Sequence, residues 1–531
     1  MSKITGAYYT PSHISDFMVS YLSDFINSSC NAILEPSVGD GSFLRALSES
    51  NSCSTERVDL TIVELDSEAI ESAYAIAAGR NAFRSVVKHN GDFLAYEPAP
   101  GNTYSLVLGN PPYIKKKFLD EEVLGRVKEC HAKAGLGLTN VSNIWTAFVL
   151  KSAELLDEHG VLALVLPADL LQVKYAEKLR VFLEERFQRL EIFVLSIRDF
   201  TGIEQQTLLL FAYKIHDSAG TFFYEVEDFE ASRIREISSN GLMISQSKWT
   251  HYTLSSAEIG LLNRINERLP RASDFITSRP GVVTGANDFF ILNEQEIAKH
   301  GAMAYKVPIL TRSSSLTCGG DFTAKMFDEI VRDGVPSYLL DLNKKNRPNS
   351  RLDDYLRHGV DLELHERYKC KKRNRWYNVP GVSEPADALI FKRIHSMPKL
   401  VRNLARVQVT DSAYLVNVRH GVDVRSFIAS FYNIITLIFT ELMGRRYGGG
   451  VLELTPSEFQ SLPMLYRHFK AKDYHRLCGQ VEFSRAGATS PHNIDFYDGL
   501  GLSAREYESL QNIYLKLKAV RLPELLVKSK G

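Results

Sequence analysis

The first 215 residues predict an α/β fold built on a parallel sheet with helices on both faces. Short apolar runs alternate there with segments in which apolar residues recur at helical spacing. The runs are apolar throughout, which is typical of strands buried on both faces of a parallel sheet. Helices fit between most of these strands, as βαβ units require. After about residue 245 the alternation fades, so a region of mixed α+β structure is expected to follow.

The elements of this α/β region follow one another closely. The first helix is expected to begin at Thr10 and Pro11, an N-cap residue followed by a first-turn proline. Strands are expected at Ala32–Leu34, Val58–Val63, Ser85–Val87, Tyr104–Leu108, Val161–Leu166, Leu190–Leu195 and Thr207–Tyr213. Helices are expected between most of them, for example Ser67–Arg80 and Asn143–His159, the second ended by Gly160. A mostly helical segment is expected from 466 to 531.

Length and composition limit the classes of protein to which the chain can belong. The 531 residues suffice for two or three domains, and 44% hydrophobic content is ordinary for a protein in water. No run of about 18 apolar residues predicts a transmembrane helix, and the first residues lack the pattern of a signal peptide. A cytoplasmic protein is therefore expected. The six cysteines contain no CxxC pair, so reduced thiols are expected and neither disulfides nor a metal site: Cys30, Cys53, Cys130, Cys318, Cys370 and Cys478.

The distribution of charge is more informative than its sum. The net charge is zero, which argues against a strongly basic nucleic-acid binder. Residues 31–100 are nevertheless rich in Asp and Glu, whereas the segments 365–377 and 391–406 are basic, and the second of these has no acid. An acidic first half followed by basic segments suits a small-molecule site joined to a module that binds a polyanion.

Four loops are expected to share one edge of the sheet. Ligands of such sheets bind beyond the carboxyl ends of the strands. The loops that begin at Glu35, Glu64, Gly91 and Gly109 should therefore open on the same rim. These loops also carry the unusual residues of the chain, so the rim is the predicted site.

The first two loops are typical of a site that binds a nucleotide-like ligand. Gly39 and Gly41 allow the backbone to approach a ligand closely where the next helix begins. A tight strand-to-helix turn would also explain them. Glu64 ends the second strand, a position from which acids commonly bind ribose hydroxyls. The alternative for Glu64 is a helix-capping acid beside Ser67.

The third loop offers an acid and an aromatic ring. The carboxylate of Asp92 can accept a hydrogen bond from the amino group of an adenine, and the ring of Phe93 can lie against a purine. Taken alone, Asp92 is more typical of a turn in which it bonds to the local backbone.

The fourth loop indicates the chemistry. A buried strand runs directly into Gly109, Asn110, Pro111, Pro112 and Tyr113. The prolines fix the backbone, so that the Asn110 side-chain oxygen and the Pro111 carbonyl are two fixed acceptors. An exocyclic amine has two N–H donors and a delocalised lone pair. Two fixed acceptors favour a pyramidal nitrogen whose lone pair can attack a methyl group, a stabilisation that is specific to the transition state. Tyr113 offers a face for stacking.

These motifs, taken in order, resemble the gamma-class adenine-N6 DNA methyltransferases of restriction–modification systems, the TaqI-methylase type. The resemblance is carried by GAYYTP at 6–11, EPSVGDGSF at 35–43, VELD at 63–66, GDF at 91–93, NPPY at 110–113, SNIWTAFV at 142–149 and GVLALVLPADLL at 160–171. Val38 departs from the family pattern, in which smaller residues are frequent. The resemblance implies a Rossmann-like domain that binds S-adenosyl-L-methionine (AdoMet).

The resemblance also implies roles for individual residues. AdoMet is expected to contact Tyr9, Thr10, Glu35, Ser37, Gly39, Gly41, Glu64, Leu65, Asp92, Phe93 and Asn110. The catalytic residues implied are Asn110, Pro111, Pro112, Tyr113 and Phe200. Phe200 is placed by its resemblance to the family loop that stacks on the flipped adenine opposite the tyrosine, in keeping with base flipping in general.

The later segments resemble the recognition domain of the same family. They are VVTGANDFFIL at 282–292, YKVPILTRSSS at 305–315 and YGGGVLELTPSEFQSLPM at 447–464. We therefore expect a catalytic domain at 1–245, a DNA target-recognition domain at 246–465 and a C-terminal extension at 466–531 packed on it. Behind a DNA-modifying domain, the basic segments are interpreted as phosphate contacts, namely Lys371, Lys372, Arg373, Arg375, Arg402 and Arg406. Their spacing suggests that Arg402 and Arg406 share one helix face.

The sequence thus predicts a site-specific adenine methyltransferase that acts on double-stranded DNA, needs no metal and works as a monomer. A separate cognate endonuclease acting on the same site is a further expected partner. Asn before Pro-Pro-Tyr favours adenine over the N4 amine of cytosine, as a tendency of the family. The alternatives are a methyltransferase for another planar amine (cytosine N4, an RNA base or a protein glutamine) and a non-catalytic DNA-binding specificity subunit.

Overall fold

The structure is a computed structural model of the chain. It describes residues 9–50, 53–79, 82–137, 141–195, 207–229, 231–239, 248–314, 316–317, 319–343, 350–447, 450–483 and 489–522. The chain divides into two compact units, residues 1–260 and 261–531.

The first unit is built on one sheet that contains nine strands within the described residues, in the order β3-β2-β1-β4-β5-β7-β6-β8-β9. Its strands are β1 (Ala32–Glu35), β2 (Asp59–Glu64), β3 (Ser85–Asn90), β4 (Tyr104–Gly109), β5 (Leu156–Pro167), β6 (Arg189–Val194), β7 (Thr207–Tyr213), β8 (Gly220–Asp228) and β9 (Arg233–Ser239). The first five strands pair in parallel, as expected. The expectation of a wholly parallel sheet was wrong for β7, which runs antiparallel to both β5 and β6.

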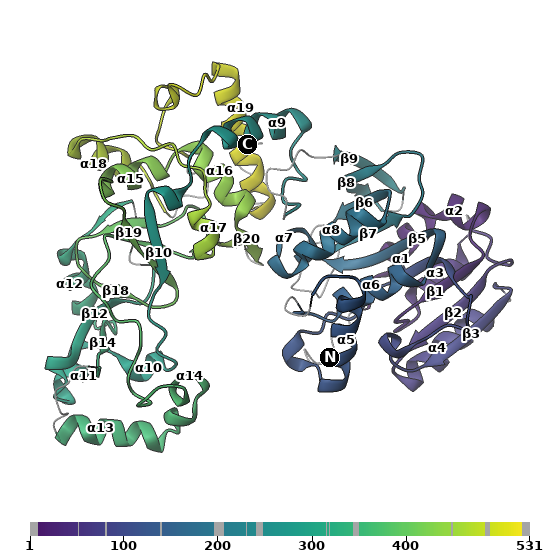
Figure 1. Cartoon of the computed structure of the whole chain (residues 1–531), viewed down its shortest axis with the longest axis horizontal. Coiled ribbons are helices and arrows are strands. Elements are labelled where there is room, and N and C mark those ends of the chain that lie inside the picture. Colours follow the sequence, from purple (N-terminus) through teal and green to yellow (C-terminus); the bar gives the residue numbers. More distant parts are fainter. Residues whose placement is uncertain are drawn as a thin grey trace. The chain divides into compact units, whose positions relative to one another are not determined.

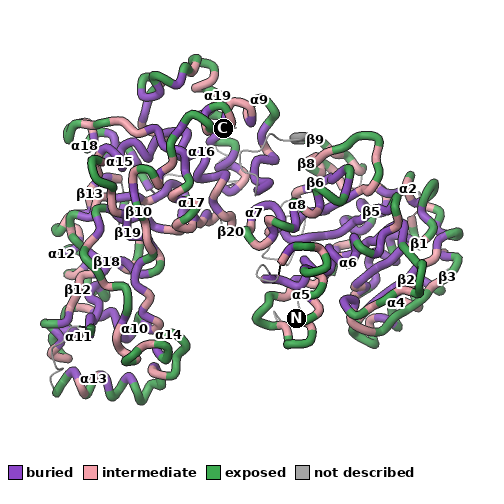
Figure 2. Tube along the Cα trace, viewed as in Figure 1, coloured by how far each residue is buried: buried purple, intermediate pink, exposed green. Residues whose placement is uncertain are grey.

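The central strands are buried on both faces, which explains their continuous apolar sequences. On one face, Ile33, Leu106 and Val165 belong to a core that also includes Phe17 and Phe43 from the helices. Leu34, Val107 and Leu164 point to the opposite face and are also fully buried. Figure 2 shows this as a buried band along the strands of the first unit.

Helices cover this sheet (Figure 1). They are α1 (Ser12–Tyr21), α2 (Ser23–Ser28), α3 (Ser42–Glu49), α4 (Ser67–Ala78), α5 (Glu121–Lys133), α6 (Trp145–Leu155), α7 (Asp169–Gln172) and α8 (Glu177–Arg186). Helix α1 begins after Pro11, which is its N-cap residue. Helix α4 begins after Asp66, whose side chain accepts hydrogen bonds from the N–H groups of Glu68 and Ala69.

Two details of the expected elements were wrong. Helix α6 ends at Leu155, and Gly160 lies inside β5 instead of ending a helix. A side chain at Gly160 would lie 2.9 Å from Leu156 and 3.1 Å from the carbonyl oxygen of Tyr104, so the glycine permits close approach of β5 to β4. Strands β8 and β9, which lengthen the sheet beyond β6, were not expected from the sequence.

The second unit has mixed α+β structure. Its strands form three sheets within the described residues, in the orders β10-β19-β15-β17-β13, β11-β14-β12-β18 and β16-β21-β20. The strands are β10 (Ile276–Pro280), β11 (Ile291–Leu292), β12 (Lys306–Leu310), β13 (Gly320–Phe322), β14 (Tyr338–Leu340), β15 (Ala388–Phe391), β16 (Arg393–Ile394), β17 (Leu400–Asn403), β18 (Gln408–Val409), β19 (Ala413–Val418), β20 (Arg445–Tyr447) and β21 (Val451–Glu453).

The helices around these sheets are mostly short. They are α9 (Ser256–Arg268), which leads into the unit, α10 (Asn287–Phe290), α11 (Glu294–Lys299), α12 (Ala324–Arg332), α13 (Ser350–Asp361), α14 (Tyr368–Lys371), α15 (Val424–Phe431), α16 (Ile434–Met443), α17 (Pro456–Gln460), α18 (Ala471–Gly479) and α19 (Ala504–Arg521). Helix α19 packs on α16. The segment after residue 466 contains α18 and α19 with long irregular stretches between them, so it is less helical than expected.

Among the described residues, no single helix has the length and apolar character to cross a membrane. Helices α15 and α16 pass that test only as a pair, with a bend of 70° between them. Their apolar side chains are buried inside the second unit.

Candidate active site

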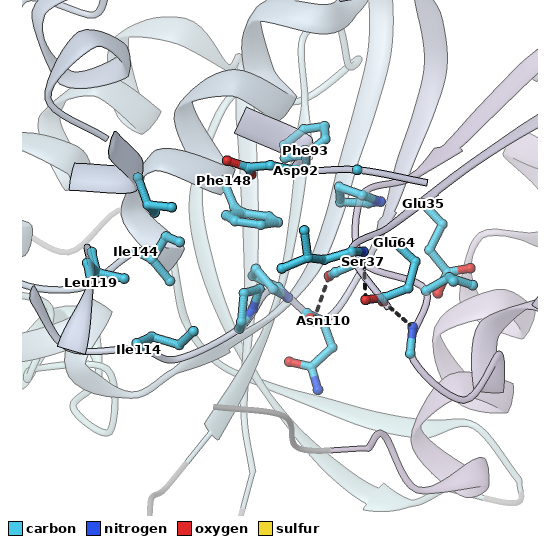
Figure 3. A pocket seen from close by; sticks show the side chains of 18 of the residues that line it. Glu35, Ser37, Glu64, Asp92, Phe93, Asn110, Ile114, Leu119, Ile144 and Phe148 are labelled. Atoms are coloured by element: carbon cyan, nitrogen blue, oxygen red, sulfur yellow. Dashed lines mark hydrogen bonds between the residues drawn. The ribbon is translucent and has the colours of Figure 1, made fainter. Parts of the chain in front are cut away.

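The loops that follow β1, β2, β3 and β4 meet at one pocket of about 510 Å³, as the sheet topology predicts. Figure 3 shows acidic side chains, Glu35 and Glu64, on one side of it, and apolar side chains on the other. The apolar side consists of Phe93, Ile114, Phe118, Leu119, Val123, Ile144 and Phe148. Tyr9 and Thr10, just before α1, also line the pocket.

The glycine loop after β1 has the backbone that only glycine adopts freely. Gly39 and Gly41 have φ angles of +53° and +76°, and Gly41 is the N-cap residue of α3. A side chain at Gly41 would lie 3.0 Å from Ile76, so this position is also crowded. The loop presents Ser37, Val38, Gly39 and Asp40 to the pocket.

Glu64 holds this loop at the end of β2. Its Oε2 accepts a hydrogen bond from the N–H of Gly39 at 2.9 Å, and its Oε1 accepts from the N–H groups of Leu65 and Asp66 at 2.8 and 3.1 Å. The alternative interpretation of Glu64 as the cap of α4 is excluded, because Asp66 is that cap. Leu65 is 73% exposed and lines the pocket.

Glu35 is the buried acid of the site. It is 2% exposed, and its Oε2 has no hydrogen-bond partner among the described residues. Burial raises the pKa of this carboxyl well above its usual range, and the charges of Asp40 and Glu64 raise it further. A buried acid without a partner is costly by itself, so its retention at the pocket indicates a ligand group that it can meet.

Asp92 and Phe93, in the loop after β3, also line the pocket. Asp92 Oδ1 accepts from the N–H of Leu94 at 2.9 Å, so Asp92 does bond locally, as its alternative interpretation holds. Its Oδ2 accepts from Nη1 of Arg126 at 2.7 Å. Phe93 is 2% exposed and packs against Phe148 with 5.0 Å between ring centres.

The loop after β4 also lines the pocket, beginning with Asn110. Asn110 Nδ2 donates to Oγ1 of Thr10 at 3.2 Å, and the Asn110 carbonyl oxygen accepts from Ser37 Oγ at 3.0 Å. The loop is therefore tied both to Thr10, two residues before α1, and to the glycine loop. Pro111 and Pro112 also line the pocket.

Tyr113 lies deeper than expected for a stacking residue. It is 8% exposed, and its hydroxyl donates to the carbonyl oxygen of Val165 at 3.0 Å. Burial raises the pKa of this phenol. Tyr113 is not among the described residues that line the pocket, so its stacking role stays a prediction. Phe200, the expected partner in stacking, lies outside the described residues.

Some pocket residues were missed by sequence reasoning. Arg126 was missed because α5 is an ordinary amphipathic helix in the sequence, with no motif. Ile144 and Phe148 lie within SNIWTAFV at 142–149, a segment that carries the family resemblance but to which no cofactor contact was assigned. Their position in that segment was the available signal.

The basic residues of the second unit divide into exposed and internally paired groups. Lys371, Lys372 and Arg375 are exposed, although Lys371 pairs with Glu366 and Lys372 donates to the hydroxyl of Tyr368. Arg373 instead donates to the carbonyl oxygens of Val283 and Thr284 and anchors α14.

The expectation that Arg402 and Arg406 share one helix face was wrong. Arg402 lies in β17 and forms a bidentate ion pair with Asp321, at 2.8 and 2.5 Å. Arg406 follows in a turn, with φ of +54°, and is exposed. The four-residue spacing of these arginines is typical of a helix, but Leu400–Asn403 forms a strand that pairs with β13 and β15.

The described cysteines form no disulfide with one another: Cys30, Cys53, Cys130, Cys370 and Cys478. Cys318 lies outside the described residues. Burial raises the pKa of Cys130 to about 11, so this thiol is poorly reactive at neutral pH. No cluster of potential metal ligands occurs in the described ranges.

The residues present fit AdoMet. The volume lies within the range of about 300–1,000 Å³ that is typical of small-molecule pockets. Glu35 can meet the ammonium group of the amino-acid end, Glu64 the ribose hydroxyls, and the apolar and aromatic side the adenine ring. The fold and the pocket together define an AdoMet-dependent methyltransferase.

Comparisons with known proteins define the family. Residues 42–200 match the model of the Eco57I restriction-modification methylase, and residues 246–486 match that of the C-terminal domain of type II methyltransferase M.Eco57I. Type II methyltransferase M.AccI of Acinetobacter calcoaceticus is 22% identical over 484 residues, which are 87% of this chain and 86% of that protein. The chain belongs to the type II restriction–modification DNA methyltransferases, and its cofactor is AdoMet.

Two further likenesses agree with this placement. Type II methyltransferase M.BstVI of Geobacillus stearothermophilus is 22% identical over 356 residues, 56% of this chain and 61% of that protein. The solved structure of the type IIL restriction-modification enzyme MmeI in complex with DNA has a TM-score of 0.53 at 11% identity, over 96% of this chain and 72% of that chain. The second likeness shows the fold alone.

Proposed function

We propose that this DNA methyltransferase transfers the methyl group of AdoMet to the exocyclic N6 amine of an adenine swung out of duplex DNA at a short specific sequence. It belongs on this view to the gamma class, and it protects DNA from a separate cognate endonuclease that recognises the same site. The protein acts as a monomer, because the adenine of each strand can be modified in a separate visit.

The observation that carries the proposal is that Asn110 lines the pocket, where its backbone carbonyl meets Ser37 (Figure 3). Its backbone carbonyl is held by Ser37, and its side-chain amide donates to Thr10. Because Nδ2 is oriented by Thr10, the side-chain Oδ1 has a defined direction. A defined acceptor beside a cofactor pocket is what the activation of a planar amine requires.

The chemistry follows from the acceptors of the loop. Bound AdoMet supplies an electrophilic methyl group on a positively charged sulfur. The Asn110 side-chain oxygen and the Pro111 carbonyl oxygen accept the two N–H groups of the target amine and localise its lone pair on nitrogen. Held in this way, the amine nitrogen is arranged for in-line attack on the methyl carbon. The N–C bond would form as the S–C bond breaks, and the neutral thioether S-adenosylhomocysteine would leave. The product ammonium is strongly acidic and releases its proton without a dedicated base.

Each of three parts of the chain has its own role in this proposal. Residues 1–245 form the catalytic domain, residues 246–465 recognise the DNA sequence, and residues 466–531 support the recognition domain. Lys371, Lys372, Arg375 and Arg406 are exposed cations that suit phosphate contacts. Tyr113 and Phe200 hold the extruded base between their rings.

Other planar amines are the nearest alternatives, because the same acceptors would serve cytosine N4, an RNA base or a protein glutamine. Family membership and the basic second unit favour DNA. A specificity subunit without catalysis is disfavoured, because all four loops of the pocket keep their polar residues.

The test is to incubate the full chain with methyl-labelled AdoMet and mixed-sequence duplex DNA, digest the DNA to nucleosides and separate them. Label in N6-methyladenine is the expected result, and sequencing of the modified positions then gives the recognition site. Label in N4-methylcytosine overturns the choice of base. Label only in RNA or protein overturns the role of the second half of the chain.

A further inference from the structure

Helix α5 forms one wall of the cofactor pocket. It follows the catalytic loop in the sequence and begins after Asp120, whose side chain accepts from the N–H of Val123 at 2.8 Å. Asp120, Glu122, Val123 and Arg126 line the pocket. The first turns of α5 therefore face the pocket, whereas no motif in the sequence distinguishes this helix.

Arg126 links α5 to the loop after β3. Its Nη1 donates to Asp92 Oδ2 at 2.7 Å, and its Nη2 donates to Glu122 one turn earlier on α5. The side chains of Arg126 and Asp92 are 29% and 20% exposed, so the pair is partly shielded from water. Hydrogen bonds between charged groups are stronger and more directional than neutral ones.

The Asp92 carboxylate is thus held at both oxygens and still has room for a ligand. Oδ1 accepts from the N–H of Leu94, and Oδ2 accepts from Arg126. An ionised carboxylate has about four acceptor sites, so these two bonds leave acceptor capacity for an amine. A guanidinium has only donors and cannot itself accept from an amine. Arg126 can therefore orient Asp92 but cannot replace it.

We propose that Arg126 is a positioning residue that fixes the Asp92 carboxylate for the exocyclic amine at C6 of the cofactor's purine, and so contributes to the choice of an adenine nucleoside over purines without that amine. This rests on the proposed contact between Asp92 and the adenine of AdoMet. Loss of Arg126 leaves Asp92 held only by the N–H of Leu94. The direction of Oδ2 is then no longer fixed, and the preference of the carboxylate for an amine falls.

The experiment compares two ligands on the full chain by isothermal titration calorimetry. The first is S-adenosylhomocysteine, and the second is its analogue with hydrogen in place of the amine at C6. The wild type should bind the first ligand more tightly. Arg126→Met should lower this ratio of affinities by about tenfold, and Arg126→Lys should give an intermediate ratio, because lysine keeps the charge without the planar fork. Lys128→Met, on the same helix, is the matched control and should keep the wild-type ratio.

A merely structural salt bridge would weaken both ligands equally, so the ratio separates the two roles. If Arg126→Met keeps the ratio while Asp92→Asn lowers it, the role of Arg126 is overturned and the role of Asp92 stands. If neither variant changes the ratio, the contact between Asp92 and the purine amine is overturned as well. Methyl transfer to DNA by the wild type is measured separately and decides the proposed function independently of both outcomes.

Discussion

The amide nitrogen of Asn110 lies 3.2 Å from the hydroxyl oxygen of Thr10, although the two residues are 100 positions apart in the chain. Thr10 is buried and lies two residues before α1, so it gives the loop after β4 a fixed support. The hydrogen bond orients the Asn110 amide and therefore the direction of its oxygen. This relationship makes the role of Asn110 testable through its neighbour.

Asn110→Ala should lower kcat for DNA methylation by about 100-fold or more, because it removes an acceptor that acts in the transition state. Thr10→Val should lower kcat by about tenfold, since it removes only the orienting bond. Thr10→Ser keeps the hydroxyl and is the control. Rates are measured at saturating AdoMet and DNA, with S-adenosylhomocysteine binding measured alongside. Turnover by Asn110→Ala near the wild-type rate would contradict the assigned role.

Glu35→Gln should change the pH dependence of stability. Because the folded pKa of Glu35 is raised, the unfolded chain releases this proton at lower pH than the folded chain. The free energy of unfolding of the wild type therefore falls as the pH rises from the unfolded pKa, about 4.3, to the folded pKa. Glu35→Gln has no carboxyl to ionise at this position. The difference in free energy of unfolding between Glu35→Gln and the wild type should therefore shift in favour of the variant as the pH rises between these two pKa values. Urea unfolding at several pH values measures it.

The same variant should lose the pH dependence of cofactor binding. An ionised Glu35 attracts the ammonium group of AdoMet, so wild-type affinity should rise with pH through the pKa of the free protein. The charges that face Glu35 are Asp40, Glu64 and Arg45, and all three are kept in the variant. An affinity for AdoMet that is equally pH-dependent in Glu35→Gln would place the titrating group elsewhere.

The exposed basic residues should contribute to DNA binding in a salt-dependent way. Replacing Lys371, Lys372 and Arg375 by alanine should weaken binding to all duplexes. It should also reduce the slope of log affinity against log salt by up to about 0.9 for each phosphate that the variant no longer neutralises. Fluorescence anisotropy at several salt concentrations measures both effects.

Two comparisons make this result specific. Replacing the exposed Lys299, Lys325 and Arg332 on α11 and α12 removes the same charge outside the basic segments and should leave the slope unchanged. Arg402→Ala should instead destabilise the second unit, because it leaves Asp321 without its bidentate partner. Equal salt slopes for the two triple variants would mean that the basic segment 365–377 does not contact the DNA.

The local chemistry of the sequence predicted the framework of the site. Apolar runs located the strands up to β7, and glycine and proline located the loops at Gly39, Gly41 and Pro111. These signals act over a few residues and can be read without the fold. What could not be predicted were the contacts between distant segments. Arg126 meets Asp92 across 34 residues and Arg402 meets Asp321 across 81, and no pattern in the sequence marks either pair.

Helix α19 is held by a buried ion pair between Arg521 and Glu441. The side chains of Arg521 and Glu441 are 1% and 3% exposed, and their two hydrogen bonds measure 3.0 and 2.6 Å. Arg521 also donates to the carbonyl oxygens of His395 and Gly450, so it joins α19 to α16 and to the turn before β21. Lys518, one turn earlier on α19, is fully buried, and its pKa is lowered to about 8 by burial.

Arg521→Ala should destabilise the second unit by about 3–5 kcal/mol, because it leaves Glu441 buried without its partner. Replacing Arg521 and Glu441 together by methionine should recover most of that loss, since the cost lies in the unpaired charge and not in the absence of the bridge. Hydrogen exchange of the α16 and α19 peptides measures the effect in this unit alone. Equal protection in the single and double variants would mean that the ion pair itself, and not the burial of an unpaired charge, determines how firmly α19 is held.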